Sequence, residues 1–268
     1  MRRWKRRLEQ FLNATASFFD RVLRALPIRA LRRLETASRR AQGIGWGVET
    51  VSSEVQAALS LLPSAVRRGP VTLDIGANVG SWTAALLTAA SDAAVYCFEP
   101  STDAFGLLAN RFSGDLGVHL VNAAVGDHVG KTQLWSDAPG SELASLSKRR
   151  LEHFGIAFGQ SEEVRVLTLD SWQEVNPVHP VLLKIDVEGH EMAVLQGATK
   201  VLKSVEVVQF EFGGSNIDSR TYFQDFFYFF REAGFRLYRL GPKGLHPIDT
   251  YSEMDEAFAT TNYFAQRI

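Results

Sequence analysis

The chain is 268 residues long and 46% of its residues are hydrophobic, which is enough for one large buried core and an appendage. Its only cysteine, Cys97, excludes an internal disulfide and a zinc site built from several cysteines, and it favours a reducing, cytoplasmic location. The net charge of −1 conceals an uneven distribution, because residues 1–40 hold twelve Lys or Arg and only three Asp or Glu. We therefore predict a basic segment joined to an acidic domain.

Residues 1–60 are predicted to form a basic, amphipathic helical extension. Apolar side chains recur at helical spacing as far as Pro27: Leu8, Phe11, Leu12, Phe18, Phe19, Val22, Leu23 and Leu26. Charged residues interrupt this segment, so it has neither the core of a signal peptide nor the roughly 18 apolar residues of a membrane-spanning helix.

Three uses of this extension stay open: docking on the chain's own domain, homodimer packing through residues 1–42, and peripheral contact with the inner face of a membrane. Nucleic acid is not an expected partner. The net charge of +9 on residues 1–40 leaves −10 for the rest of a chain whose total is −1, and that acidic remainder would repel a phosphate backbone.

Residues 61–268 are predicted to form a catalytic domain whose first strand, Val71–Ile75, opens into a glycine-bearing turn before a helix. Four residues of this segment are candidate cofactor contacts: Asp74, Gly76, Asn78 and Gly80. The glycines permit positive φ and a close ligand approach, and the helix start offers N–H groups to a carboxylate. Asn78 stands where a G-x-G-x-x-G loop has its second glycine, which favours S-adenosylmethionine over a dinucleotide. Asp74 would lie near the ammonium and sulfonium groups of that cofactor.

A second apolar run, Ala94–Phe98, is followed by Glu99. A carboxylate at the tip of the second strand can accept both ribose hydroxyl protons, and it is expected about 20 residues beyond the glycine turn. Asn122 lies in the third run, residues 118–124, and Asp127 follows it. Both are candidates for contacts with the adenine edge.

Further strand-like runs cover residues 132–135, 164–169, 181–187, 205–212, 235–240 and 261–266. Helical patterns separate several of them, which predicts an α/β fold with a mostly parallel sheet and helices on both faces. The last two runs have no helix between them, so we expect an antiparallel pair at the sheet edge. The aromatic cluster at residues 222–230 has helical spacing and is interpreted as core.

Charged residues interrupt the run at residues 181–187. Lys184 and Asp186 are two positions apart, so they point to the same face of a strand that should otherwise be apolar. More charged residues follow at the carboxyl end of this strand, where open α/β sheets bind ligands. A catalytic group is predicted there: Asp186, Glu188 and His190. Lys184 and Glu211, near the end of the following run, are predicted to bind substrate, and a structural ion-pair network remains the alternative.

Seven segments match one known pattern in order: residues 74–80, 98–100, 122–127, 167–170, 183–191 and 194–198, and Glu211. Together they resemble the FkbM family of S-adenosylmethionine-dependent methyltransferases. The resemblance spans residues 71–212, with a weaker match at residues 262–265 and no counterpart for residues 1–60. It implies a Rossmann-like, seven-stranded class I methyltransferase sheet and methylation of a hydroxyl on a sugar, glycolipid or other small metabolite.

The resemblance also gives the charged group the role of a base, because an alcohol is a poor nucleophile until its proton is removed. His190 titrates in the useful range, and Asp186 or Glu188 could serve if burial raised their pKa. The same three residues could hold a divalent metal. The segment lacks the Asp-Asn pair of catechol-type methyltransferases, however, so no metal site is predicted.

Two other functions stay open. A nicotinamide-dependent oxidoreductase or epimerase would share the sheet, but the chain lacks its G-x-G-x-x-G loop and a suitably placed Tyr-x-x-x-Lys pair. A non-catalytic adaptor could keep the methyltransferase fold without the activity. The intact acids and glycines of the predicted cofactor site favour an enzyme over that adaptor.

Overall fold

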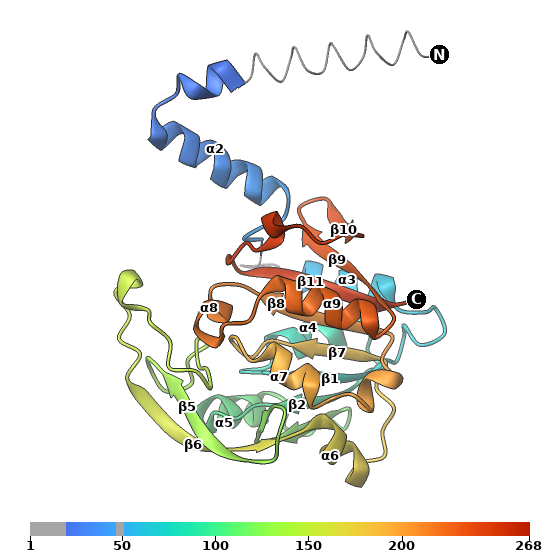
Figure 1. Cartoon of the computed structure of the whole chain (residues 1–268). Helices are drawn as coiled ribbons and strands as arrows, with labels where there is room; N and C mark the ends of the chain where they lie inside the picture. Colours follow the sequence, from blue (N-terminus) through green and yellow to red (C-terminus); the bar gives the residue numbers. More distant parts are fainter. Residues whose placement is uncertain (1–19, 47–50) are drawn as a thin grey trace, which may run out of the picture. The chain divides into compact units, whose positions relative to one another are not determined.

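A computed structural model describes residues 20–46 and 51–268 (Figure 1). The chain divides into two compact units, with the boundary between Gln42 and Gly43. The described part of the first unit contains helix α2 (Ile28–Ala41), in which no residue is buried. Most of the predicted apolar series, up to residue 19, lies outside the described residues. None of the helices in the described ranges is long and apolar enough to cross a membrane.

Within residues 51–268, the second unit contains an eight-stranded sheet with the order β10-β9-β11-β8-β7-β1-β2-β3 (Figure 1). Its strands are β1 (Val71–Ile75), β2 (Ala94–Phe98), β3 (Val118–Val121), β7 (Leu182–Ile185), β8 (Val207–Phe212), β9 (Phe235–Gly241), β10 (Gly244–Ile248) and β11 (Thr261–Arg267). Strands β1, β2, β3, β7 and β8 pair in parallel, whereas β11 is antiparallel to both neighbours. This confirms the predicted Rossmann-like α/β sheet.

The sheet has one strand more than the seven expected. The extra strand, β10, forms a hairpin with β9, and its residues are not among the runs predicted from the sequence. Pro247 makes this strand hard to predict, because proline has no N–H to donate within a sheet. An edge strand tolerates proline, since one side of it needs no hydrogen-bond partner. The antiparallel pairing of β9 with β11 is confirmed, but its expected position at the edge is wrong, since β11 lies between β8 and β9.

Three further strands form a separate sheet, with the order β4-β6-β5: β4 (Ala124–Val125), β5 (Gly130–Ser136) and β6 (Gln160–Leu167). The sequence predicts these runs in the main sheet, and this prediction is wrong. Instead, β5 and β6 pair with each other in antiparallel register. Residues 137–159 connect them, and part of this long connection reaches the cavity described below.

Helices cover both faces of the main sheet: α3 (Val51–Leu61), α4 (Ser81–Ala89), α5 (Thr102–Arg111), α6 (Leu169–Val175), α7 (Glu191–Gln196), α8 (Ser215–Ser219) and α9 (Phe223–Glu232). Single 3-10 turns lie at Glu152–Phe154, Val201–Lys203 and Glu253–Asp255. Of the three core clusters, one contains residues of α3, α4 and α5, and another contains residues of α6, α7 and α9. The aromatic side chains of α9 at positions 223, 226, 227 and 230 are buried, which confirms that this cluster is core.

Helix α3 belongs structurally to the second unit, because Val55, Ala58 and Leu59 are buried in its core with residues of α4. The predicted extension of residues 1–60 included this helix. The division of the chain into two domains at residue 60 stays a prediction.

Candidate active site

A cavity of about 440 Å³ lies at the carboxyl ends of β1, β2, β7 and β8. Seven of the predicted site residues line it: Gly76, Asn78, Glu99, Lys184, Asp186, Glu188 and Glu211. Its size and position are those of ligand sites in open α/β sheets. A second cavity, of about 570 Å³, lies before the amino ends of β1 and β2. None of the predicted site residues lines it, so the first cavity is the candidate active site.

The turn after β1 is held between the ends of two other strands. The backbone N–H groups of Gly76 and Ala77 donate to the carbonyl oxygen of Phe98 at 2.9 and 3.0 Å. Gly76 has φ 75°, and a Cβ atom there would lie 1.8 Å from the carbonyl oxygen of Asp186. Only glycine satisfies both conditions, so this residue sets the path of the turn. Asn78, with φ 48°, continues the turn in a conformation that asparagine tolerates.

The carboxylate of Glu99 is fixed in the wall of the cavity. One oxygen accepts the N–H of Asn78 and the other accepts the N–H of Ser101, both at 2.8 Å. Burial raises the pKa of Glu99 to about 7. Each oxygen retains a second lone pair. The group is therefore suited to accept hydrogen bonds from two neighbouring hydroxyls of a ribose.

Asp74 and Lys184 form a buried ion pair behind the turn. The Nζ atom of Lys184 lies 3.1 Å from Oδ1 of Asp74, and it donates to the carbonyl oxygen of Gly76 at 2.9 Å. The other oxygen of Asp74 accepts the hydroxyl of Thr83 at 2.6 Å. Asp74 does not line the cavity, so its effect on a ligand passes through Lys184 and the turn.

The turn after β7 is organised by Glu191, which is only 1% exposed. Its carboxylate accepts the N–H groups of Val187 and Gly189 and the side-chain amide of Asn216. Within this turn Glu188 has φ 52°, an uncommon conformation for its residue type. Glu191 therefore has a structural role, and the turn that it holds presents Glu188 to the cavity.

Arg149, which is not among the predicted site residues, reaches the site from the connection between β5 and β6. Its Nη1 atom donates to Oε2 of Glu188 at 2.6 Å, and its Nε lies 3.8 Å from a carboxylate oxygen of Asp218. The hydroxyl of Ser145, from the same connection, donates to the carbonyl oxygen of Glu188 at 2.7 Å. No motif marks an irregular segment of this kind, so only the tertiary structure identifies these contacts.

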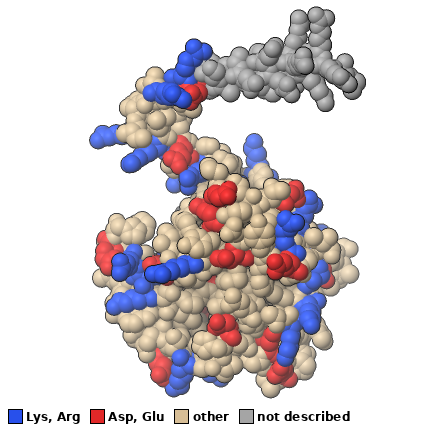
Figure 2. Space-filling model, in the orientation of Figure 1, with Lys and Arg blue, Asp and Glu red and all other residues tan. Residues whose placement is uncertain are grey.

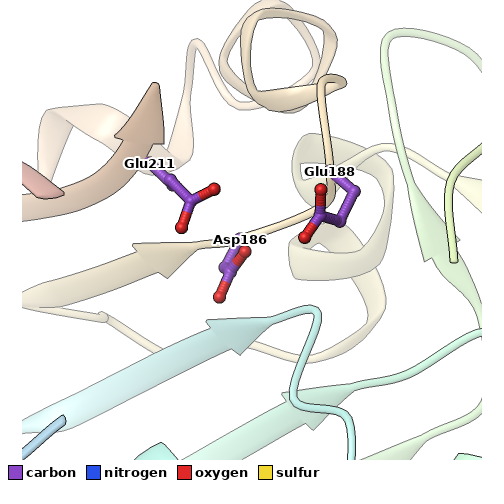
Figure 3. A group of neighbouring side chains, drawn as sticks. All are labelled: Asp186, Glu188 and Glu211. Atoms are coloured by element: carbon purple, nitrogen blue, oxygen red, sulfur yellow. The ribbon is translucent and has the colours of Figure 1, made fainter. Parts of the chain in front are cut away.

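Three carboxylates meet at one end of the cavity: Asp186, Glu188 and Glu211 (Figure 3). One oxygen atom from each lies within 4.8 Å of the others. Burial and the charge of Asp186 raise the pKa of Glu188 to about 8, although Arg149 opposes this. Burial and the neighbouring carboxylates also raise the pKa of Glu211 well above its usual value.

Besides Asp74, four predicted residues do not line this cavity: Gly80, Asn122, Asp127 and His190. Gly80 packs against α5, since a Cβ atom there would meet Phe112. The side-chain amide of Asn122 donates to the carbonyl oxygens of Glu99 and Pro100 and so supports the end of β2. Asp127 is exposed and contacts the ring of His128 at 2.6 Å. Burial lowers the pKa of His190. The predicted roles of all four stay predictions.

A mostly parallel sheet, a glycine turn after the first strand and an acid at the tip of the second define a Rossmann-like protein of the class I methyltransferase type. Residues 74–237 match the family described as "Methyltransferase FkbM domain". This match covers more than half of the chain, which therefore belongs to the FkbM methyltransferase family.

Two characterised relatives and one solved structure are similar to the chain. The hexuronic acid methyltransferase AglP of Haloferax volcanii is 28% identical over 169 residues, which cover 61% of this chain and 64%, less than two thirds, of AglP. The 2-O-methyltransferase NoeI of Sinorhizobium fredii is 22% identical over 181 residues, or 64% of this chain and 74% of NoeI. The crystal structure of methyltransferase FkbM from Methylobacillus flagellatus gives a TM-score of 0.47 at 15% identity, covering 74% of this chain and 44% of that one.

Proposed function

We propose that this protein transfers a methyl group from S-adenosylmethionine to a hydroxyl group of a sugar or another small metabolite. The observation that carries the proposal is the fixed carboxylate of Glu99 in a cavity bounded by the glycine turn. Membership of the FkbM family supports methyl transfer. The names of two relatives, one a hexuronic acid methyltransferase and one a 2-O-methyltransferase, support a sugar hydroxyl as acceptor.

The residues of the cavity fit this cofactor. Glu99 presents two acceptor oxygens to a ribose diol. The turn from Gly76 to Val79 leads into the amino terminus of α4, and the first N–H groups of a helix, which have no partner within it, suit a carboxylate. When bound, the cofactor supplies a methyl carbon attached to a positively charged sulfur. The ammonium group of Lys184 is not available to bind the cofactor, because it already pairs with Asp74 and donates to the carbonyl oxygen of Gly76.

The acidic end of the cavity is the proposed acceptor site. In the transfer, a lone pair of the acceptor oxygen forms the new C–O bond, the electrons of the C–S bond remain on sulfur, and the hydroxyl proton must leave. Asp186, Glu188 and Glu211 are the titratable groups of this end. The pKa of Glu188, about 8, is close to the operating pH that suits a base. A base so placed contributes roughly 10²- to 10⁴-fold to the rate.

Calorimetric titration with S-adenosylhomocysteine tests the cofactor site. Glu99→Ala should weaken binding by about 10- to 100-fold or more, because it removes charge-assisted hydrogen bonds worth about 1.5–3 kcal/mol each. Glu163→Ala is the matched control, since Glu163 is an exposed acid that does not line the cavity. Unchanged affinity in a folded Glu99→Ala protein would refute this assignment.

Parallel titrations with NAD⁺ separate the remaining alternatives. Binding of NAD⁺ without binding of S-adenosylhomocysteine would indicate an oxidoreductase or epimerase, and binding of neither would indicate an adaptor. Transfer of radiolabelled methyl from S-adenosylmethionine to a panel of neutral sugars and uronic acids then identifies the acceptor. If the wild type binds cofactor but methylates no hydroxyl in the panel, the proposed acceptor class is wrong.

A further inference from the structure

We propose that Asp186, Glu188 and Glu211 bind one divalent cation of the hard, oxygen-preferring class, Mg²⁺ or Mn²⁺, at the acceptor end of the cavity. The three side chains come from the end of β7, from the turn that follows it and from β8, and they point into one shared space (Figure 3). Carboxylate oxygens are the ligands that such cations prefer.

The spacing of the three carboxylates suits a single ion. One oxygen from each residue lies within 4.8 Å of the others. Ligand oxygens at about 2.0–2.1 Å from Mg²⁺ are separated by at most about 4 Å. A movement of the three carboxylates toward one another by less than about 1 Å would therefore bring them to one ion. Three protein ligands also leave coordination positions open on the side of the cavity.

Glu211 provides an independent reason to expect a cation. The side chain of Glu211 is partly buried, and the residue lines the cavity. No hydrogen-bond donor or cation within residues 20–46 and 51–268 pairs with its carboxylate. Four other carboxylates act on it: Asp186, Glu188, Glu191 and Glu54. A buried carboxylate without a partner is costly, so this position lacks a positive ligand.

The neighbouring basic side chains do not supply that charge. The ammonium group of Lys184 lies 3.1 Å from Asp74 and 3.6 Å from Asp186. The guanidinium group of Arg149 lies 2.6 Å from Glu188 and 3.8 Å from Asp218. Both cations pair with acids other than Glu211. A divalent ion would balance the remaining negative charge at the point where the three carboxylates meet.

A cation at this position would also promote deprotonation of the acceptor hydroxyl. This part of the proposal rests on the proposed function. An acceptor hydroxyl bound to a divalent ion loses its proton more readily, because the ion stabilises the alkoxide. The proton would pass to solvent or to a carboxylate of the site, and the oxygen would then form the bond to the methyl carbon. Cation binding itself requires only the three carboxylates and does not depend on methyl transfer.

The test is titration of the full-length protein with Mn²⁺, with free Mn²⁺ followed by electron paramagnetic resonance. The wild type should bind one Mn²⁺ per chain, and Mg²⁺ should compete. Glu211→Gln, which keeps the shape of the side chain, should weaken Mn²⁺ binding at least tenfold, as should Asp186→Asn. Glu142→Gln is the control, because Glu142 is an exposed acid of the same cavity outside the trio, and it should change the affinity less than twofold.

Thermal unfolding of each variant shows whether it is folded. The proposal is overturned if the wild type binds no Mn²⁺ up to about 10 mM, which is above the weakest dissociation constants typical of protein cation sites. It is also overturned if folded Glu211→Gln binds Mn²⁺ as tightly as the wild type. Binding of S-adenosylhomocysteine to the same metal-free wild type tests the proposed function separately. If the wild type binds S-adenosylhomocysteine but not Mn²⁺, only the cation proposal fails. If it binds Mn²⁺ but not S-adenosylhomocysteine, only the proposed function fails.

Discussion

The carboxylate of Glu99 is held in place by backbone N–H groups of Asn78 and Ser101, so its protonation state should control ligand binding. Only the ionised group can accept hydrogen bonds from two hydroxyls through both of its oxygens, and burial raises its pKa to about 7. Affinity for S-adenosylhomocysteine should therefore fall about tenfold between pH 8 and pH 6. Calorimetry at the two pH values measures this. Nearby acids such as Glu188 and Glu191 titrate in the same range, so the decisive comparison is Glu99→Gln, which should show a much smaller dependence. An equal pH dependence in that variant would contradict the assignment.

Glu211 should reduce the stability of the metal-free protein at high pH. Its folded-state pKa is raised, so the carboxyl group favours folding when protonated, and this contribution is lost as the pH rises through that pKa. Glu211→Gln removes the charge, and at pH 8 it should raise the melting temperature by about 2–6 °C in the presence of a chelator. Differential scanning calorimetry at pH 5 and pH 8 measures the effect. Equal melting temperatures for the wild type and Glu211→Gln at pH 8 would show that the neighbouring carboxylates do not destabilise the ionised Glu211.

At the scale of elements, the turn between β1 and α4 depends on Gly76. Alanine there would have to adopt φ 75° and would place its Cβ 1.8 Å from the carbonyl oxygen of Asp186. Gly76→Ala should lower the unfolding free energy by about 1 kcal/mol or more and weaken S-adenosylhomocysteine binding at least tenfold. Gly106, in helix α5 with open space around it, is the matched control. Gly106→Ala should stabilise the protein by about 0.5–1 kcal/mol and leave binding unchanged. Denaturant unfolding and calorimetry on both variants check the contrast, and equal behaviour would refute it.

The elements that carry the cofactor site could be predicted because they are local in sequence. The runs at β1 and β2 are short, apolar and bounded by turn residues, and Gly76 and Glu99 directly follow the strands that place them. Strand partners could not be predicted in the same way. The residues of β5 and β6 look like strands, but nothing in their periodicity shows that they pair with each other in a separate sheet. Pairing is a long-range property, and side-chain alternation does not encode it.

His190 illustrates a different limit. It follows Glu188 by two positions, so the two side chains would share one face if the strand continued through them. Strand β7 ends at Ile185, however, and Glu188 and Gly189 have φ of 52° and 102°. The alternation of side chains no longer applies in this turn, and Glu188 lines the cavity whereas His190 does not. Glu211, by contrast, belongs to a regular strand, and it joins the acidic group as its position in β8 allows.

At the scale of the whole molecule, the first unit has a feature that the methyltransferase fold does not require. Figure 2 shows Lys and Arg side chains gathered on its described part, and five arginines lie within α2: Arg29, Arg32, Arg33, Arg39 and Arg40. Leu31 and Leu34 lie on the side of the helix opposite most of these arginines, and residue Leu34 is 50% exposed. A helix with one apolar and one basic face is typical of attachment to an anionic membrane surface.

We therefore expect residues 1–42 to attach the protein to a membrane surface that carries anionic lipids. The attraction should be about 1 kcal/mol per basic residue near the bilayer, and it should weaken with salt. Flotation with phosphatidylserine vesicles at low and high salt, for the full-length protein and for residues 43–268, measures it. Leu34→Glu is a matched variant, because it keeps every arginine but removes an exposed apolar side chain. Flotation should be lost on truncation and reduced in Leu34→Glu, with cofactor binding retained in both. If truncation instead changes only the mass measured by light scattering, the segment joins two subunits. If it changes neither flotation nor mass, the segment docks on its own domain.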